Sequence, residues 1–319
     1  MTVFTPFGLT REPFGTEPDA ELFYPALGHE DCLERLRLTV ALGMGLGIVT
    51  GETGFGKSTV RAKLLDEIAH HPGLTIAPID DPTACRTDVL FLRRIMGQIG
   101  LAGIGRTGLD LTTALLRDLA ARRAGGEHVL LVIDDAHGLA SNQLDVLRTL
   151  VAAETPAPLA VLLFGEPELM EKVARKRNLA QRAAMTHALN PLNRRDTAGL
   201  IAHRLTVAGR EDGQEVFTAE AIDEIHVATG GVPAGIVRLA ASSMDAAVAS
   251  GTQTVDGDLA RRVIGAGTKT NGTGDVATTG TTRTATSVVQ TSFAAQLERL
   301  TATPESTGRN GRGGSERKR

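Results

Sequence analysis

Residues 46–59 read LGIVTGETGFGKST, and this stretch decides the fold. Its segment from Gly51 to Ser58, GETGFGKS, fits the pattern GxxxxGK[ST]. The segment follows an apolar run, 46–51, and leads into a helical pattern, 58–71. Backbone N–H groups of such a glycine-rich turn wrap phosphates, and the N-terminus of the following helix favours an anion. The stretch therefore predicts a phosphate-binding loop between a buried strand and a helix.

The loop predicts ATP and Mg²⁺ as cofactors. The Lys57 ammonium is expected to reach the β- and γ-phosphates and to serve in catalysis, and the Ser58 hydroxyl is expected to ligate Mg²⁺. The residues expected to bind the nucleotide are Gly51, Glu52, Thr53, Gly54, Phe55, Gly56, Lys57, Ser58 and Thr59. The alternative is a glycine-rich turn that carries a surface lysine.

Outward from the loop, apolar runs alternate with helical patterns. The runs that read as strands are 46–51, 74–80, 128–135, 158–165 and 185–192. Continuous apolar strands separated by helices predict a parallel sheet covered on both faces, an α/β fold of three layers. After residue 192 the helical patterns 194–208, 218–229, 233–249 and 256–264 predict a small all-α unit.

Acidic residues end two of these strands. The run VLLVIDD ends in Asp134 and Asp135. Ligands of open α/β sheets bind at the carboxyl ends of the strands, so Asp134 is expected to hold Mg²⁺ and Asp135 to orient or deprotonate the attacking water. Glu166, after the run 158–165, is expected in a sensor position near the γ-phosphate. The alternative is that these are ordinary solvated acids, and a carboxylate beside phosphate is electrostatically unfavourable.

Two arginines are expected to contact a nucleotide. Arg182 lies just before the last predicted strand, where an assembly of P-loop proteins can present an arginine to the nucleotide of a neighbouring subunit. It would neutralise the charge of the transition state in trans. Arg238 lies one turn into the pattern 233–249 and would point back toward the phosphates. The alternative for both is a solvated surface arginine.

Composition limits the class of protein. The 319 residues are 42% hydrophobic and 22% charged with a net charge of −3, which excludes wholesale disorder. Aromatic residues make up 3%, with no Trp, which argues against base-stacking nucleic-acid modules. The longest mainly apolar stretch, 38–49, is too short to cross a membrane, and the N-terminus lacks a signal-peptide pattern. We expect a soluble, cytoplasmic protein without a membrane span.

The composition changes near residue 267. Residues 268–319 are rich in Thr and Gly and end in GRNGRGGSERKR. Such a segment buries too little apolar surface to offset the entropy lost on ordering. It therefore predicts a disordered basic tail.

These motifs resemble those of the AAA+ ATPases of the ExeA general-secretion type and of the related transposition regulators of the TnsC, TniB and MuB type. The segments that match are GETGFGKST (Walker A), LLVIDDAHGL (Walker B), VLLFGEPELMEKVARKRNLAQR, TGGVPAGIVRLA and the leader GLTREPFGTEPDAELFYPALGHEDCLERL. The resemblance implies a leader bordering the nucleotide pocket (1–35), an AAA+ P-loop domain (36–192), a helical lid (193–267) and the tail (268–319). It also implies self-association into a ring or filament.

Three positions depart from the usual pattern of that family. Asp135 stands where glutamate is general, Glu166 where an uncharged polar residue is usual, and Ala234 where the lid motif commonly has arginine. Arg238 is then a weak substitute for that arginine. A misplacement of about 1 Å can lower a rate on the order of 100-fold. The departures predict tight ATP binding with slow hydrolysis, which suits a switch rather than a motor.

The resemblance leaves several functions open. Our leading expectation is an oligomeric ATPase that loads on double-stranded DNA and regulates a transposase, consistent with the basic residues of 172–177 and of the tail. The second is an ATPase that assists assembly of a secretion system, whose members usually continue into a membrane span and a cell-wall-binding domain; we expect neither here. The third is a nucleotide-gated interaction protein with vestigial hydrolysis. A small-molecule kinase suits the lid and the trans arginine less well.

Overall fold

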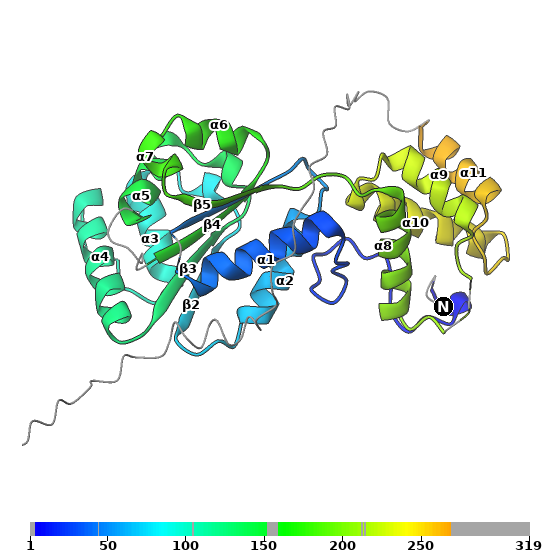
Figure 1. Cartoon of the computed structure of the whole chain (residues 1–319), viewed down its shortest axis with the longest axis horizontal. Helices are drawn as coiled ribbons and strands as arrows, with labels where there is room; N and C mark the ends of the chain where they lie inside the picture. Colours follow the sequence, from blue (N-terminus) through cyan, green and yellow to red (C-terminus); the bar gives the residue numbers. More distant parts are fainter. Residues whose placement is uncertain are drawn as a thin grey trace, which may run out of the picture.

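The computed structural model describes residues 4–43, 45–103, 105–151, 159–211, 213 and 215–268. Within them, five strands form one parallel sheet: β1 (Leu46–Thr50), β2 (Leu74–Ile79), β3 (His128–Ile133), β4 (Leu159–Gly165) and β5 (Ala183–Ala188). The order across the sheet is β2-β3-β4-β1-β5 (Figure 1). The predicted α/β fold is confirmed. The predicted tail lies outside the described residues, apart from residue 268.

Helices cover both faces of the sheet (Figure 1). On one face, α1 (Leu27–Ala41) and α2 (Lys57–Ile68) bury Leu33 and Leu64 against Phe164 of β4. On the other face, the core takes in α3 (Asp88–Gln98), α4 (Gly108–Ala124), α5 (Ser141–Val151), α6 (Glu168–Ala174) and α7 (Arg177–Ala180). Every residue of β1 and β4 is buried, which is why these strands read as continuous apolar runs.

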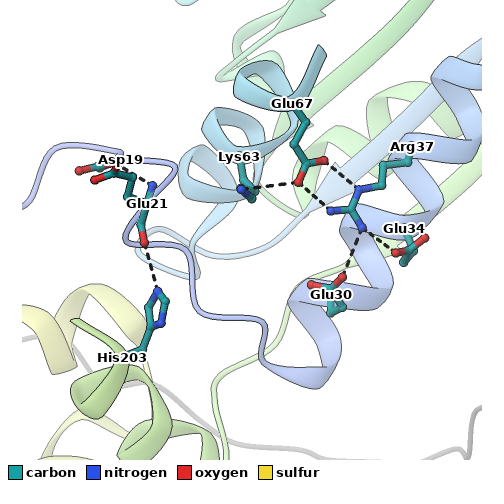
Figure 2. Close-up of polar contacts among 8 residues, drawn as sticks. All are labelled: Asp19, Glu21, Glu30, Glu34, Arg37, Lys63, Glu67 and His203. Carbon is teal, nitrogen blue, oxygen red and sulfur yellow. Dashed lines mark hydrogen bonds and ion pairs between the residues drawn. The ribbon is translucent and has the colours of Figure 1, made fainter. Parts of the chain in front are cut away.

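An ion-pair network holds α1 to α2 (Figure 2). Arg37 donates from Nε and Nη2 to the two carboxylate oxygens of Glu67 at 2.8 and 2.7 Å. Its Nη1 donates to Glu34 at 2.6 Å and to Glu30 at 3.3 Å. The bidentate contact is a strong form of charge-assisted hydrogen bond. It therefore fixes α2, and the loop that precedes it, against α1.

A helical unit follows the sheet: α8 (Arg194–Val207), α9 (Ala219–Thr229), α10 (Pro233–Ala249) and α11 (Gly257–Thr268). The leader, defined in the structure as residues 4–26, shares the core of this unit and places the N-terminal end of the chain beside it (Figure 1). Phe7 is fully buried there, and the Phe14 ring packs edge-on against Phe217 with centroids 5.9 Å apart. Over the described ranges, no helix combines the length and apolar composition that a bilayer crossing requires.

The end of β5 differs from the prediction. The sequence predicts a strand over 185–192, but β5 begins earlier and ends at Ala188. Pro191 has no N–H to donate to a sheet. The Leu192 N–H donates instead to the Gly231 carbonyl at 2.8 Å, within the helical unit. Leu189 and Leu192 are thus apolar because they are buried in two different cores.

The register of the sheet brings several loop residues to one edge. The last residues of β1 and β4, Thr50 and Gly165, pair with each other, and so do the last residues of β2 and β3. The residues that follow these four strands therefore meet at one edge of the sheet: Gly51, Asp80, Asp134 and Glu166.

Candidate functional site

The loop between β1 and α2 surrounds the Lys57 side chain. Gly54 and Gly56 have φ of +85° and +90°, a left-handed backbone that glycine adopts without steric cost. Lys57 begins α2 and is buried, and its Nζ donates to the carbonyls of Gly51 at 2.7 Å and Glu52 at 3.0 Å. The ammonium therefore lies inside the loop, within reach of a phosphate bound there.

Carboxylates surround this ammonium. Burial lowers the pKa of Lys57, while the charges of Glu166, Asp134 and Asp135 act to raise it. These charges favour the protonated form, which is the form that binds phosphate. A bound phosphate chain would offset the desolvation of the ammonium in the same way.

His29 of α1 supports the loop. It is buried, and its Nε2 donates to the Phe55 carbonyl at 2.8 Å. A Cβ at Gly56 would lie 2.9 Å from the same Nε2, so this close approach requires glycine. Burial lowers the pKa of His29, although the hydrogen bond to Phe55 and the charge of Asp196 raise it. The neutral imidazole is therefore the favoured form.

Asp134 lies buried at the end of β3, facing Ser58. The Ser58 Oγ donates to Asp134 Oδ2 at 3.3 Å, and the Asp135 N–H donates to Oδ1 at 3.1 Å. A hydroxyl beside a carboxylate provides the hard oxygen ligands that Mg²⁺ prefers. Ser58 and Asp134 therefore fit the Mg²⁺ that accompanies a bound nucleotide.

Asp135 has a backbone conformation that is rare for a residue other than glycine. Its φ is +46°, and its side chain is 68% exposed and lines a cavity. Strained backbone of this kind concentrates at functional sites. A carboxylate in this position can orient a water molecule and accept its proton.

Glu166 contacts the loop directly. The Thr53 Oγ1 donates to Glu166 Oε1 at 2.7 Å. This hydrogen bond lowers the pKa of Glu166, and the charges of His137 and Lys57 lower it further. An ionised carboxylate therefore lies at the loop that would bind the phosphates.

A cavity of about 310 Å³ opens between the sheet edge, the leader and the helical unit. The loop, Asp135 and Glu166 line its charged end. The lining from the leader and from α8 and α10 is mostly apolar and includes Pro18, Leu22, Phe23, Leu200, Pro233, Ala234 and Val237. A cavity with a charged end and an apolar end suits a nucleotide, which joins a phosphate chain to a flat base.

The helical unit lines the cavity through α10 and α8. At the charged end, the Ala234 N–H of α10 donates to the Gly54 carbonyl at 3.1 Å. From α8, the Arg204 guanidinium also lines the cavity, and its Nη1 donates to the carbonyls of Gly15 at 3.0 Å and Pro13 at 3.3 Å. Burial lowers the pKa of Arg204 to about 10.

A second contact joins α8 to the leader (Figure 2). His203 Nε2 donates to the Glu21 carbonyl at 3.1 Å. Together with the Arg204 hydrogen bonds, this contact holds the leader against α8.

The structure brings most predicted site residues together. Those that line the cavity are Thr53, Gly54, Gly56, Lys57, Ser58, Thr59, Asp135 and Glu166. The other predicted residues adjoin them: Gly51 and Glu52 accept hydrogen bonds from Lys57, Phe55 accepts one from His29, and Asp134 faces Ser58.

Two predicted arginines lie apart from this group. Arg182 is exposed and precedes the first residue of β5, at the sheet edge opposite the loop. Arg238 of α10 is exposed and is not among the residues that line the cavity. Its neighbours Ala234 and Val237 line the cavity instead. The roles of both arginines stay predictions.

Three residues of the site escaped the sequence analysis. Arg61 contacts Asp134, and its position three residues after Ser58 on a helix is the signal that identifies it. His29 and Arg204 act through backbone carbonyls of distant segments. Such partners leave no pattern in the sequence.

The chain is similar in sequence to a known domain family and to a known protein. A family model described as an AAA domain matches residues 41–173. General secretion pathway protein A of Aeromonas hydrophila is 33% identical over 259 residues, which cover 79% of this chain and 46% of that protein. The chain thus spans about half the length of this relative.

Solved structures share the fold. The ORC2 protein of Aeropyrum pernix, in ADPNP-ADP complexes, has a TM-score of 0.59 at 16% identity, covering 80% of this chain and 71% of that chain. Cdc6p of Pyrobaculum aerophilum has a TM-score of 0.60 at 16% identity, covering 77% and 69%. Drosophila ORC bound to DNA has a TM-score of 0.57 at 15% identity, covering 80% and 66%.

At these identities the structural similarity shows the fold alone. That fold is the P-loop nucleoside triphosphatase fold of the AAA+ class. Together with the matched family model and the relative, it supports an AAA+ ATPase.

Proposed function

We propose that this protein binds Mg²⁺-ATP in the cavity between the sheet and the helical unit, hydrolyses it slowly, and acts as an ATP-dependent switch. The observation that carries the proposal is the meeting of Lys57, Ser58 and Asp134 at the sheet edge beside this cavity. The two ends of the cavity, one charged and one apolar, support a nucleotide as the ligand.

Each side chain has a stated task in this proposal. Lys57 binds the β- and γ-phosphates, and Ser58 and Asp134 hold Mg²⁺, which neutralises phosphate charge when bound. Asp135 orients the attacking water and accepts its proton. Arg182 of one subunit acts on the nucleotide of the next in a ring or filament, and Arg238 approaches the phosphates when the helical unit moves.

Three features support slow hydrolysis. Glu166 holds a carboxylate at the phosphate end of the cavity, where it opposes the charge of the terminal phosphate. Asp135 is one methylene shorter than the glutamate that the resemblance leads us to expect. Ala234 contributes a backbone N–H to the loop at the position where that family commonly has an arginine.

The contact between α10 and the loop supports a switch. Ala234 bonds directly to Gly54, so a change in the loop on nucleotide binding is transmitted to α10. The helical unit and the leader then move with the state of the nucleotide. We propose that the ATP-bound arrangement is the one that self-associates.

Isothermal titration of the whole chain with ATP and MgCl₂ tests the binding site. We expect saturable binding, and Lys57→Ala to weaken it at least 100-fold, since the ammonium inside the loop is lost. Lys63→Ala removes the same charge from a half-buried position of α2 that pairs with Glu67, and it is the matched control. Absence of heat with wild-type protein would overturn the proposal, and so would turnover of many ATP per second by the isolated protein.

Two partner roles remain, each with its own support. The relative from the general secretion pathway favours assistance to assembly of a secretion system. The fold shared with ORC proteins, one of them solved with DNA, is consistent with loading on DNA. Regulation of a transposase rests on the sequence resemblance alone. We propose the DNA role first, because Arg175 and Arg177 are exposed at α6 and α7 and offer contacts for phosphates. Lys172 and Lys176 of the same stretch instead contact His137 and Asp145 within the protein.

Electron microscopy with a non-hydrolysable ATP analogue separates the two roles. The DNA role predicts rings or filaments on duplex DNA that dissociate as salt is raised. Absence of DNA binding at low salt, with nucleotide binding intact, would refute the DNA role and leave the secretion role.

A further inference from the structure

Arg61 bridges two carboxylates at the edge of the sheet. It lies one helical turn after Ser58 on α2, on the same face of the helix. Its Nη1 donates to Asp80 Oδ1 at 2.6 Å, and its Nη2 lies 3.2 Å from Asp134 Oδ2. The same Oδ2 accepts the hydrogen bond from Ser58. The guanidinium therefore contacts the oxygen that faces the expected Mg²⁺ ligand.

Burial makes this contact electrostatically important. The side chains of Arg61 and Asp134 are 16% and 12% exposed, whereas Asp80 is 73% exposed. Charges removed from water interact more strongly than exposed ones. The Arg61 Nε is also buried and has no hydrogen-bond partner among the described residues, so the contacts to Asp80 and Asp134 account for the position of this side chain.

The other cation near this site, the Lys57 ammonium, makes its hydrogen bonds to backbone carbonyls and not to Asp134. Lys57 donates to the carbonyls of Gly51 and Glu52. Arg61 thus supplies the cation in direct contact with Asp134 in the described part of the chain.

We infer that Arg61 is a positioning residue that sets the affinity of this site for Mg²⁺. It neutralises Asp134 when no metal is bound and competes with Mg²⁺ for that carboxylate. Asp80 gives the guanidinium a second partner, which it keeps when Asp134 turns to the metal. The inference rests on the proposed function, because it requires phosphates and Mg²⁺ at the loop.

Competition of this kind reduces the dependence of nucleotide binding on Mg²⁺. Without the metal, the Arg61 charge makes the site more favourable for a polyanion. When Mg²⁺ is present, the Arg61 charge repels the metal, and the guanidinium competes with it for the Asp134 Oδ2 oxygen. A neutral residue at position 61 should therefore weaken nucleotide binding in EDTA. It should also increase the gain in nucleotide affinity that Mg²⁺ provides.

The test measures the dissociation constant of a fluorescent, non-hydrolysable ATP analogue for the whole chain, in excess EDTA and in excess MgCl₂. The ratio of the two constants, EDTA over MgCl₂, reports the dependence on Mg²⁺. We expect Arg61→Gln to raise this ratio about tenfold. Arg61→Met, a second neutral variant that keeps the apolar stem, should match it. Arg61→Lys, which restores the charge, should return the ratio toward the wild-type value.

Lys63→Gln is the matched control. It lies on the same helix and loses the same charge, but its Nζ pairs with Glu67 at 3.6 Å (Figure 2). We expect the wild-type ratio in this variant. A ratio raised as much as in Arg61→Gln would overturn the inference, because the effect would then be one of net charge.

The outcomes separate this inference from the proposed function. A merely structural role of Arg61 lowers affinity by the same factor in both buffers and leaves the ratio unchanged, which would overturn the inference alone. Wild-type protein that binds the analogue in neither buffer would overturn both.

Discussion

Glu166 places a carboxylate beside the loop, with its pKa lowered by Thr53, His137 and Lys57. At the scale of single residues, this negative charge is the feature that most directly repels the terminal phosphate of ATP. We expect Glu166→Gln to lower the dissociation constant for ATP about tenfold, and that for ADP by less, because ADP lacks the terminal phosphate. The glutamine amide oxygen still accepts the Thr53 hydrogen bond. Calorimetric titration with each nucleotide measures the difference.

Glu168→Gln is the control for this change. Glu168 is two residues away and exposed, and it does not line the cavity. We expect wild-type affinities for both nucleotides. Equal gains for ATP and ADP in Glu166→Gln would contradict a contact with the terminal phosphate.

A buried histidine, His29, and a half-buried one, His187, make stability depend on pH. Burial lowers the pKa of His29 and of His187. The unfolded chain binds protons near the ordinary histidine pKa of about 6.5, whereas the folded chain resists them. The free energy of unfolding should therefore be highest above pH 6.5 and fall as the pH drops below it.

Urea unfolding at pH 7.5 and 5.5 measures this fall. In the double variant His29→Gln/His187→Gln the fall should be smaller, whereas the exposed His70→Gln should leave it unchanged. A fall of wild-type size in the double variant would show that other groups carry the pH dependence.

The site residues that the sequence could predict are those within one motif or at the end of one strand. Lys57 and Ser58 follow from the glycine pattern, and Asp134 from an apolar run that ends in acids. Arg61 required knowing that β2 and β3 are neighbours, since its partners Asp80 and Asp134 follow those strands. Pairing between strands is set by the whole sheet and leaves no local signal.

At the scale of elements, the connection between α9 and α10 determines how the helical unit meets the sheet. Gly231 has φ +78°, and a Cβ there would lie 2.1 Å from the Leu192 carbonyl oxygen. Gly230 has φ +58°, but a Cβ there would meet nothing within 4 Å. We expect Gly230→Ala to cost about 1 kcal/mol of unfolding free energy, from backbone strain alone.

Gly231→Ala should cost at least about 2 kcal/mol more, because backbone must also move to relieve the overlap. Urea unfolding of both variants measures the difference. Equal losses would show that the Leu192 contact is not tightly packed.

Element types were predictable because the apolar periodicity reports burial. β1, β3 and β4 are buried on both faces and read as strands. The same signal misplaced the end of β5, since Leu189 and Leu192 are buried for other reasons. Periodicity shows that a residue is buried, and the identity of the burying partner comes only from the tertiary structure.

At the scale of the whole molecule, Arg204 joins the leader to the helical unit through Pro13 and Gly15. We expect Arg204→Met to release the leader, so that trypsin cleaves at Arg11 faster than in wild-type protein. ATP affinity should fall about tenfold, since the apolar end of the cavity loses its fixed wall. Timed proteolysis and calorimetry measure the two effects.

Arg195→Met is the control, because Arg195 is exposed on the same helix. It should leave cleavage at Arg11 and ATP affinity unchanged. Unaltered cleavage in Arg204→Met would show that the leader is held by its phenylalanines alone.

The shared core of leader and helical unit also bears on synthesis of the chain. The ribosome delivers Phe7 and Phe14 before the sheet, yet their partners in α8–α11 emerge after it. The sheet unit is complete earlier and can fold while translation continues. A translation product that stops before α8 would carry the intact loop but leave both phenylalanine rings without their core, and such truncated chains should aggregate or bind chaperones.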